Sequence, residues 1–227
     1  MRHLQSLLSV ALLLLAALPH AVSAQAEAAG VVTAVSGSVQ ALTPAGIIRV
    51  LREDDEVFAG ERIETARRSS IALEFRDETV FELSENSSMV VESYNDSENA
   101  PSLTTRVLGG VFRFVSGLIA KRQPEAMSVQ LSVATIGIRG TNVVGEVGPE
   151  SATIVLLEPE AGDTPQTAIL VSNQFGSVVV DQPGWGTEIP DANSPPSPPR
   201  RMALRTIQNL MRTLQSVGRV RVPNVRF

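Results

Sequence analysis

The chain has 227 residues, 43% of them hydrophobic, and a formal net charge of −5, which suits one folded domain with additional terminal segments. It contains no cysteine, and its two histidines are His3 and His20. Disulfides and thiol chemistry are therefore excluded. Zinc sites are built mainly from His and Cys, and the rest of the chain has neither, nor a histidine to act as the base of an acyl-transfer triad. Carboxylate chemistry, chemistry of the single lysine Lys121, and oxygen-ligated calcium remain.

Residues 1–24 have the pattern of a secretory signal peptide. Arg2 supplies a positive charge, residues 10–18 form a short apolar run, and small residues offer cleavage positions after Ala24 or Ala26. The apolar run is shorter than the ~20 residues that span a bilayer, which favours cleavage over a retained anchor. We therefore expect a mature protein outside the cytoplasm, either periplasmic or secreted.

Residues 25–189 show short strand patterns separated by turn signals. Ile71, Leu73 and Phe75 alternate with more polar neighbours, a turn is expected at residues 76–78, and Phe112 and Phe114 share a face with Arg113 opposite. Turn signals roughly 8–12 residues apart favour an all-β fold, an antiparallel β-sandwich or roll of many short strands. The strand patterns lie at residues 30–42, 68–94, 103–117, 134–148, 152–160 and 167–184.

An acidic run occupies residues 53–56. Its spacing is not that of a calcium loop, in which acids alternate with other residues and a glycine, so we expect a solvated turn. Calcium binding and docking of a basic partner are the alternatives. Residues 94–102, rich in Asn, Asp and Ser, also predict a turn.

The stretch "ATIGIRGTNVVGEVG" at residues 134–148 reads as one strand with an unusual centre. Ile136 and Ile138 would face the core, and Gly137 and Arg139 would lie on the opposite face. Gly140 suits a bulge or a close backbone approach. The candidate structural motif is Gly137, Arg139, Gly140 and Thr141, with the guanidinium bonded to carbonyls or to a carboxylate of an acidic loop. The alternative is a ligand-binding corner.

Trp185 lies between two glycines in "QPGWGTE". We expect it to fold back over the sheet, because a lone tryptophan on a glycine loop does not by itself indicate a partner. An exposed contact with a partner is the alternative.

Residues 190–200 hold five prolines and predict an extended linker. Residues 201–227 predict a basic tail whose helix has an apolar face made of Ala203, Ile207, Leu210, Met211, Leu214 and Val217. Candidate partner contacts on the opposite face are Arg201, Arg205, Arg212 and Arg219. The charge is −13 over residues 25–199 and +7 over residues 200–227, so the acidic body is a poor nucleic-acid binder.

Three interpretations of this helix stay open. It binds an anionic membrane surface, it packs on the acidic body of the same or a second copy, or it docks a partner. The sequence predicts no oligomeric state.

Several motifs in order resemble the extracytoplasmic domain of the FecR family, over residues 30–147. They are "SGSV" at 36–39, "AGERIETA" at 59–66, "IALEFRDETVFELSENSS" at 71–88, "LGGVFRF" at 108–114 and "VATIGIRGT" at 133–141. Glu61 replaces the usual aspartate of the second motif, and Glu78 stands where the family often has a turn glycine.

The resemblance implies an all-β, non-enzymatic module that binds a protein or a ligand in cell-envelope sensing. Family regulators carry a cytoplasmic segment that binds a sigma factor, and nothing in residues 1–24 resembles it, so the anti-sigma role does not transfer. We expect an envelope protein partner, no catalytic residue, no metal site and no cofactor. The alternative is an envelope protein that binds or cleaves glycans, resting on the surface acids and Trp185.

Overall fold

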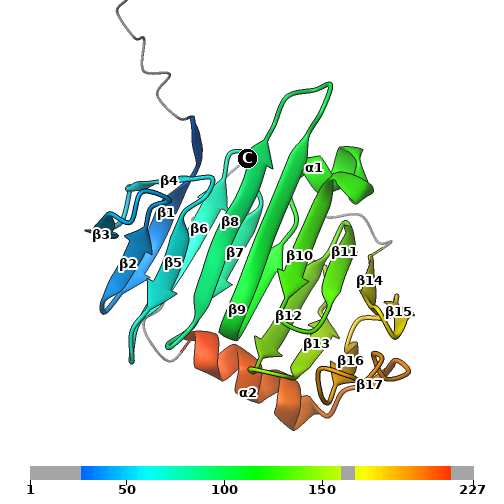
Figure 1. Cartoon of the computed structure of the whole chain (residues 1–227). Helices are drawn as coiled ribbons and strands as arrows, with labels where there is room; N and C mark the ends of the chain where they lie inside the picture. The colour runs from blue at the N-terminus through cyan, green and yellow to red at the C-terminus, as the bar shows by residue number, and fades with distance from the viewer. Residues whose placement is uncertain (1–26, 160–166, 216–227) are drawn as a thin grey trace, which may run out of the picture.

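The computed structural model describes residues 27–159 and 167–215 (Figure 1). The predicted signal peptide and Arg219 lie outside the described residues. Within them, no helix combines the length and the apolar character needed to cross a membrane.

Strands dominate, as predicted, and they form two layers that share one long strand (Figure 1). Sheet A contains, in spatial order, β4 (Glu56–Phe58), β1 (Ala28–Ser36), β6 (Ser70–Phe75), β7 (Val80–Leu83), the second half of β9 (Ser102–Val115), β12 (Asn142–Val147), β13 (Ala152–Leu156), β16 (Trp185–Ile189) and β17 (Arg200–Arg201). Sheet B contains β3 (Ile48–Val50), β2 (Val39–Leu42), β5 (Arg62–Thr65), β8 (Ser88–Asn95), the first half of β9, β10 (Met127–Leu131), β11 (Thr135–Arg139), β14 (Ala168–Asn173) and β15 (Gly176–Val180).

Neighbouring strands are antiparallel except β9 and β10, which are parallel. Parallel neighbours need a longer connection than a hairpin, and here it contains helix α1 (Leu118–Arg122) and the 3-10 helix η1 (Pro124–Ala126). Helix α2 (Leu204–Gln215) follows the last strand.

The core lies between the two sheets and confirms the predicted alternation. Ile71, Leu73 and Phe75 are at most 1% exposed. Phe81, which lies on β7, stacks on Phe112 and Phe114 of β9 with ring centroids 6.0 and 5.7 Å away. Burial of such side chains is the main source of stability in a sandwich of this size.

β9 passes from one sheet to the other at a pair of glycines. Its residues up to Gly109 pair with β8, and Gly110 begins its pairing with β12. Gly110 has φ +94°, a conformation that side chains with a Cβ rarely adopt. The glycines therefore provide the bend that lets one strand serve both layers.

The prediction of one continuous strand over residues 134–148 is wrong. β11 belongs to sheet B and β12 to sheet A, with Gly140 at φ +55° between them. Ile136 and Ile138 are buried as expected, but the alternation fails after the corner, where Val143 and Val144 are both 0% exposed. Val143 faces the core between the sheets, whereas Val144 lies in a second apolar cluster outside sheet A.

Six strands lie outside the predicted strand ranges, namely β3, β4, β5, β10, β16 and β17. The acidic run begins with a turn at residues 53–54, and its last residue, Glu56, begins β4. The Arg52 N–H donates to the Asp55 carboxylate at 2.7 Å, and Asp54 has φ +68°.

The proline-rich segment runs beside β16. The Ser197 N–H donates to the Glu188 carbonyl at 2.9 Å, and the Thr187 hydroxyl donates to the Ser197 carbonyl at 2.7 Å. Arg201 lies on β17, opposite Trp185, so the helix begins three residues later than predicted, at Leu204. Pairing with β16 keeps Arg201 extended.

α2 lies against the outer face of sheet A, below the strands in Figure 1. Leu210 and Leu214, at 5% and 7% exposed, pack with Val111, Val144 and Val155 of the sheet. The apolar face of the helix is thus covered by its own domain.

Candidate functional site

A shallow groove opens on the outer face of sheet B where β11, β14 and β15 run side by side. Its volume is about 370 Å³. Gly137 lies opposite Leu170, which in turn lies opposite Val179, so these positions form one row across the strands. The groove is lined by Pro124, Glu125, Gly137, Ile138, Arg139, Ala168, Ile169, Leu170 and Val179.

The floor of the groove depends on Gly137. A Cβ built on this residue would lie 3.7 Å from the Leu170 Cβ, an ordinary van der Waals separation, with nothing closer. The glycine is therefore not required by the backbone, and its missing side chain leaves space above the sheet. Leu170 and Val179 remain 45% and 55% exposed beside that space.

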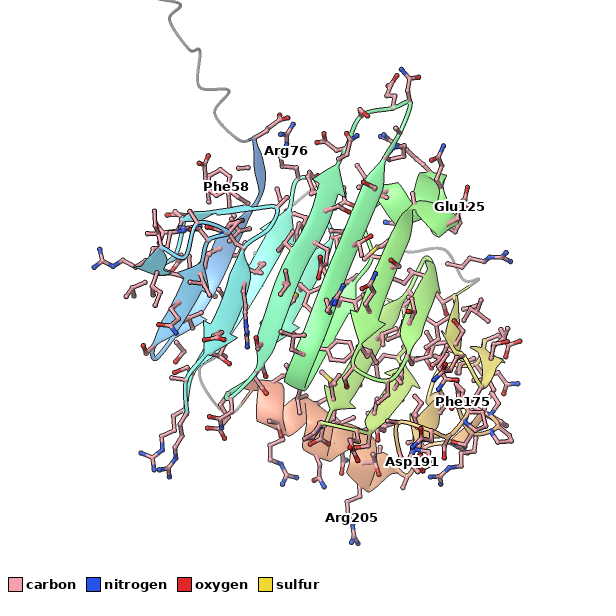
Figure 2. All side chains as sticks on the ribbon, in the orientation of Figure 1. Phe58, Arg76, Glu125, Phe175, Asp191 and Arg205 are labelled. Atoms are coloured by element: carbon pink, nitrogen blue, oxygen red, sulfur yellow. The ribbon has the colours of Figure 1, made fainter. Side chains whose placement is uncertain are left out.

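The rim of the groove is charged. Arg139 is exposed at the end of β11, and no described residue gives its guanidinium a hydrogen bond or an ion pair. The described residues therefore do not test the structural staple expected for Arg139, which stays a prediction. Glu125 lies exposed on η1, at the upper right of Figure 2.

Thr141 and Gly140, the other members of the predicted motif, have structural roles. The Thr141 N–H donates to the Ser116 hydroxyl at 2.7 Å, and the Ser116 N–H donates to the Thr141 carbonyl at 2.9 Å. Thr141 is 3% exposed, and Gly140 makes the turn between the sheets. Two residues of the predicted motif, Gly140 and Thr141, thus belong to the turn between the sheets. The other two, Gly137 and Arg139, line the groove.

The predicted partner contacts near the C-terminus do not line this groove. Trp185 is half-buried and packs against the main core, in line with the expected fold-back over the sheet. Arg205 and Arg212 are exposed on α2, and Arg205 points away from the sheets in Figure 2. Arg201 lines a separate hollow of about 500 Å³ at the start of α2.

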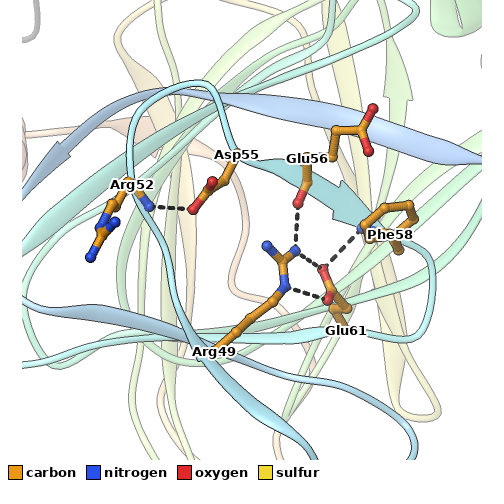
Figure 3. A network of polar contacts seen from close by, with 6 residues as sticks. All are labelled: Arg49, Arg52, Asp55, Glu56, Phe58 and Glu61. Atoms are coloured by element: carbon orange, nitrogen blue, oxygen red, sulfur yellow. Dashed lines mark hydrogen bonds and ion pairs between the residues drawn. The ribbon is translucent and has the colours of Figure 1, made fainter.

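An ion pair that the sequence did not indicate fixes the β3 edge (Figure 3). The Arg49 Nε and Nη2 donate to the two Glu61 carboxylate oxygens at 3.0 and 2.8 Å, and the Phe58 N–H donates to the same carboxylate at 3.0 Å. The hydrogen bond with Glu61 raises the pKa of Arg49, against the opposing effect of burial. Bidentate pairing of this kind is geometrically specific, so Glu61 holds β3 against the turn before β5.

Three of the sequence motifs meet at one buried corner. The Thr65 hydroxyl donates to the Ser84 carbonyl at 2.5 Å and accepts from the Ser87 N–H at 2.8 Å. Ser87 also packs against Gly110, where a Cβ would clash with its side chain. The motifs that carry the resemblance are therefore structural at this point.

No described group of three or more His, Cys, Asp or Glu residues could hold a metal ion. The acidic run at residues 53–56 does not form such a group in the described structure.

Comparisons with known proteins support the family resemblance. A family model described as FecR protein matches residues 61–160. Two crystal structures of a proposed anti-sigma factor from Parabacteroides distasonis, at 1.65 and 2.50 Å resolution, are similar with TM-scores of 0.49 and 0.50 at 10% identity. Each alignment covers 66% of this chain and 64% of the solved chain. At 10% identity, the similarity with a TM-score of 0.50 supports the fold alone. No curated protein matches the chain.

Proposed function

We propose that this chain, whose residues 61–160 form a FecR-family domain, is a non-catalytic binding module that takes part in cell-envelope sensing or signal transduction. A periplasmic or secreted location is part of the proposal and rests on the signal-peptide pattern of residues 1–24. The protein acts by holding a protein partner rather than by transforming a substrate.

The observation that carries the proposal is the groove of β11, β14 and β15. It combines exposed apolar side chains, Leu170 and Val179, with the exposed guanidinium of Arg139, which has no hydrogen-bond or ion-pair partner among residues 27–159 and 167–215. The buried centre of a protein interface is more apolar than the rest of the surface, and arginine is enriched in interfaces. The paired strands of the sheet hold the backbone of these residues in place, which lowers the ordering cost of binding. The partner segment that fits is an apolar side chain with a neighbouring carboxylate.

Capture of partners from an envelope extract by the immobilised full chain tests this proposal. Leu170→Asp and Arg139→Glu are expected to abolish recovery of a partner that the unchanged chain retains, with the melting temperature unaltered. Leu204→Asp and Arg205→Glu are matched controls, because these residues are also exposed but lie outside the groove. A partner retained equally by all five proteins, or by none of them, contradicts a binding role for the groove.

Glycan binding is a separate outcome of the same design. If the full chain co-sediments with peptidoglycan and Leu170→Asp does not reduce the sedimented fraction, the protein is a glycan binder and the groove is not its site. Trp185 offers little support for that outcome, since it packs against the core.

A further inference from the structure

The other edge of sheet B carries an exposed apolar strand. Ile47, Ile48 and Val50 are 63%, 61% and 63% exposed. Among the described residues, β3 pairs with β2 and with no other strand. A bare apolar edge invites pairing with another strand, and proteins usually protect such edges with charge or a covering segment.

The backbone of β3 is oriented for such pairing. The Leu51 N–H donates to the Val39 carbonyl, and the Thr43 N–H donates to the Ile47 carbonyl, both at 2.9 Å. The backbone N–H and C=O groups of residues 47, 49 and 51 therefore point toward β2. In an antiparallel ladder the intervening residues, Ile48 and Val50, therefore direct their N–H and C=O groups away from the sheet.

The surroundings of β3 select the charge of its partner. Arg49 is neutralised by Glu61, whereas Glu53, Asp54 and Glu56 in the adjoining turn are exposed. A strand added at β3 would face apolar side chains beside this acidic turn. Its complement is an extended segment that alternates apolar and basic residues and carries no acid.

Residues 220–227 of this chain, "VRVPNVRF", have that composition. Arg221 lies between Val220 and Val222, Arg226 lies between Val225 and Phe227, and no acid occurs anywhere after residue 199. Pro223 lacks an N–H and is tolerated only in a strand with one paired side, so the added strand would end the sheet. We propose that residues 220–227 pair with β3 as an additional edge strand and cover Ile48 and Val50.

Disulfide trapping in the full chain tests the pairing, because the natural sequence has no cysteine to interfere. Ile48→Cys and Val50→Cys are each combined with Val222→Cys under mild oxidation. The expected result is rapid cross-linking in at least one pair, at least tenfold faster than in the control pair Leu170→Cys with Val222→Cys. A monomeric product assigns the strand to the same copy, and a dimeric product assigns it to a second copy. Equal rates for the test and control pairs overturn the proposal.

Charge reversal supplies a second, independent measurement. Arg221→Glu with Arg226→Glu is expected to slow trapping about fivefold, as for the loss of two exposed ion pairs. Adding Glu53→Lys with Asp54→Lys should restore the rate, whereas Arg205→Glu with Arg212→Glu should leave it unchanged. Equal slowing by both pairs of arginine substitutions would indicate a general charge effect and count against specific pairing. None of the charge-reversal variants changes a residue of the groove. A negative result for the pairing of residues 220–227 therefore does not contradict the proposed function.

Discussion

Thr65 lies at a corner where its hydroxyl acts as donor and acceptor in the same buried site. Thr65→Val keeps the shape but leaves the Ser87 N–H and the Ser84 carbonyl each short of one partner. We expect a loss of about 1–3 kcal/mol in the free energy of unfolding, the cost of unsatisfied buried polar groups. Urea denaturation measures it. Thr104→Val, which removes only a long 3.5 Å contact with Ser128, should change stability far less.

Glu78 occupies the left-handed region in the turn between β6 and β7, with φ +67°. This conformation costs a non-glycine residue roughly 1–2 kcal/mol. Glycine avoids that cost, but it loses more backbone entropy on folding, which destabilises the folded state by up to ~1 kcal/mol. We expect Glu78→Gly to raise the free energy of unfolding by about 0.5 kcal/mol, and Glu78→Ala to give no such gain. A lower denaturation midpoint for the glycine variant would show that the Glu78 side chain has a role of its own.

Tyr94 provides a pH readout, because it is the one tyrosine of the chain. Burial, followed by the nearby charges of Asp77 and Asp96, raises its pKa above the usual range. The folded state then keeps its proton when the unfolded state loses it, so stability falls as the pH rises above about 10. Absorbance near 295 nm should show tyrosinate appearing together with unfolding. Tyrosinate formation in the folded protein at pH 10 would contradict the expected burial.

The sequence predicts residues whose surroundings are local and misses those whose partners are distant. Ile71, Leu73 and Phe75 follow from alternation alone. The Arg49–Glu61 pair depends on the fold of the β3 and β4 turns, which no periodicity encodes. Leu170 and Val179 alternate with equally apolar neighbours, so the sequence cannot tell which face is buried and the groove is invisible to it.

At the scale of elements, α2 was predicted as a helix, but the surface of sheet A on which it packs was not. Its apolar face follows from helical spacing, but sheet A provides the complementary residues from three separate strands. The start of the helix also depends on a distant feature, the pairing of Arg201 with β16. The same limit applies to Gly140, because a glycine within a strand pattern does not tell a bulge from a change of sheet.

Replacement of Leu214 by Asp tests whether α2 is part of the cooperative fold. Leu214 is 7% exposed, so a charge there is expected to lower the free energy of unfolding by about 2–5 kcal/mol or to release the helix. Thermal unfolding followed by circular dichroism distinguishes the two results. Leu204→Asp, at a position 68% exposed, is the matched control. An unchanged melting temperature and helix content in both variants would show that the contact contributes little.

At the scale of the whole molecule, the two sides of sheet B differ in their exposed surfaces. One side of sheet B offers the groove with Arg139, and the other offers β3 beside exposed acids. α2 covers part of the outer face of sheet A. Sequence patterning supports the sandwich as a whole, because strand alternation and turn spacing are local. The order of strands within each sheet is set by contacts between distant segments, so the sequence left it open.

The path of β9 has a consequence for the exchange of backbone amides with deuterium. Because this strand pairs with β8 and β10 in sheet B and with β7 and β12 in sheet A, neither layer can open fully without breaking its bonds. Subglobal opening of one layer is therefore disfavoured, and amides on both sides of Gly109 and Gly110 should exchange only through global unfolding. Mass spectrometry of exchanged peptides should find them the slowest of the described chain. Faster exchange on one side of the glycines would show that one layer opens independently of the other.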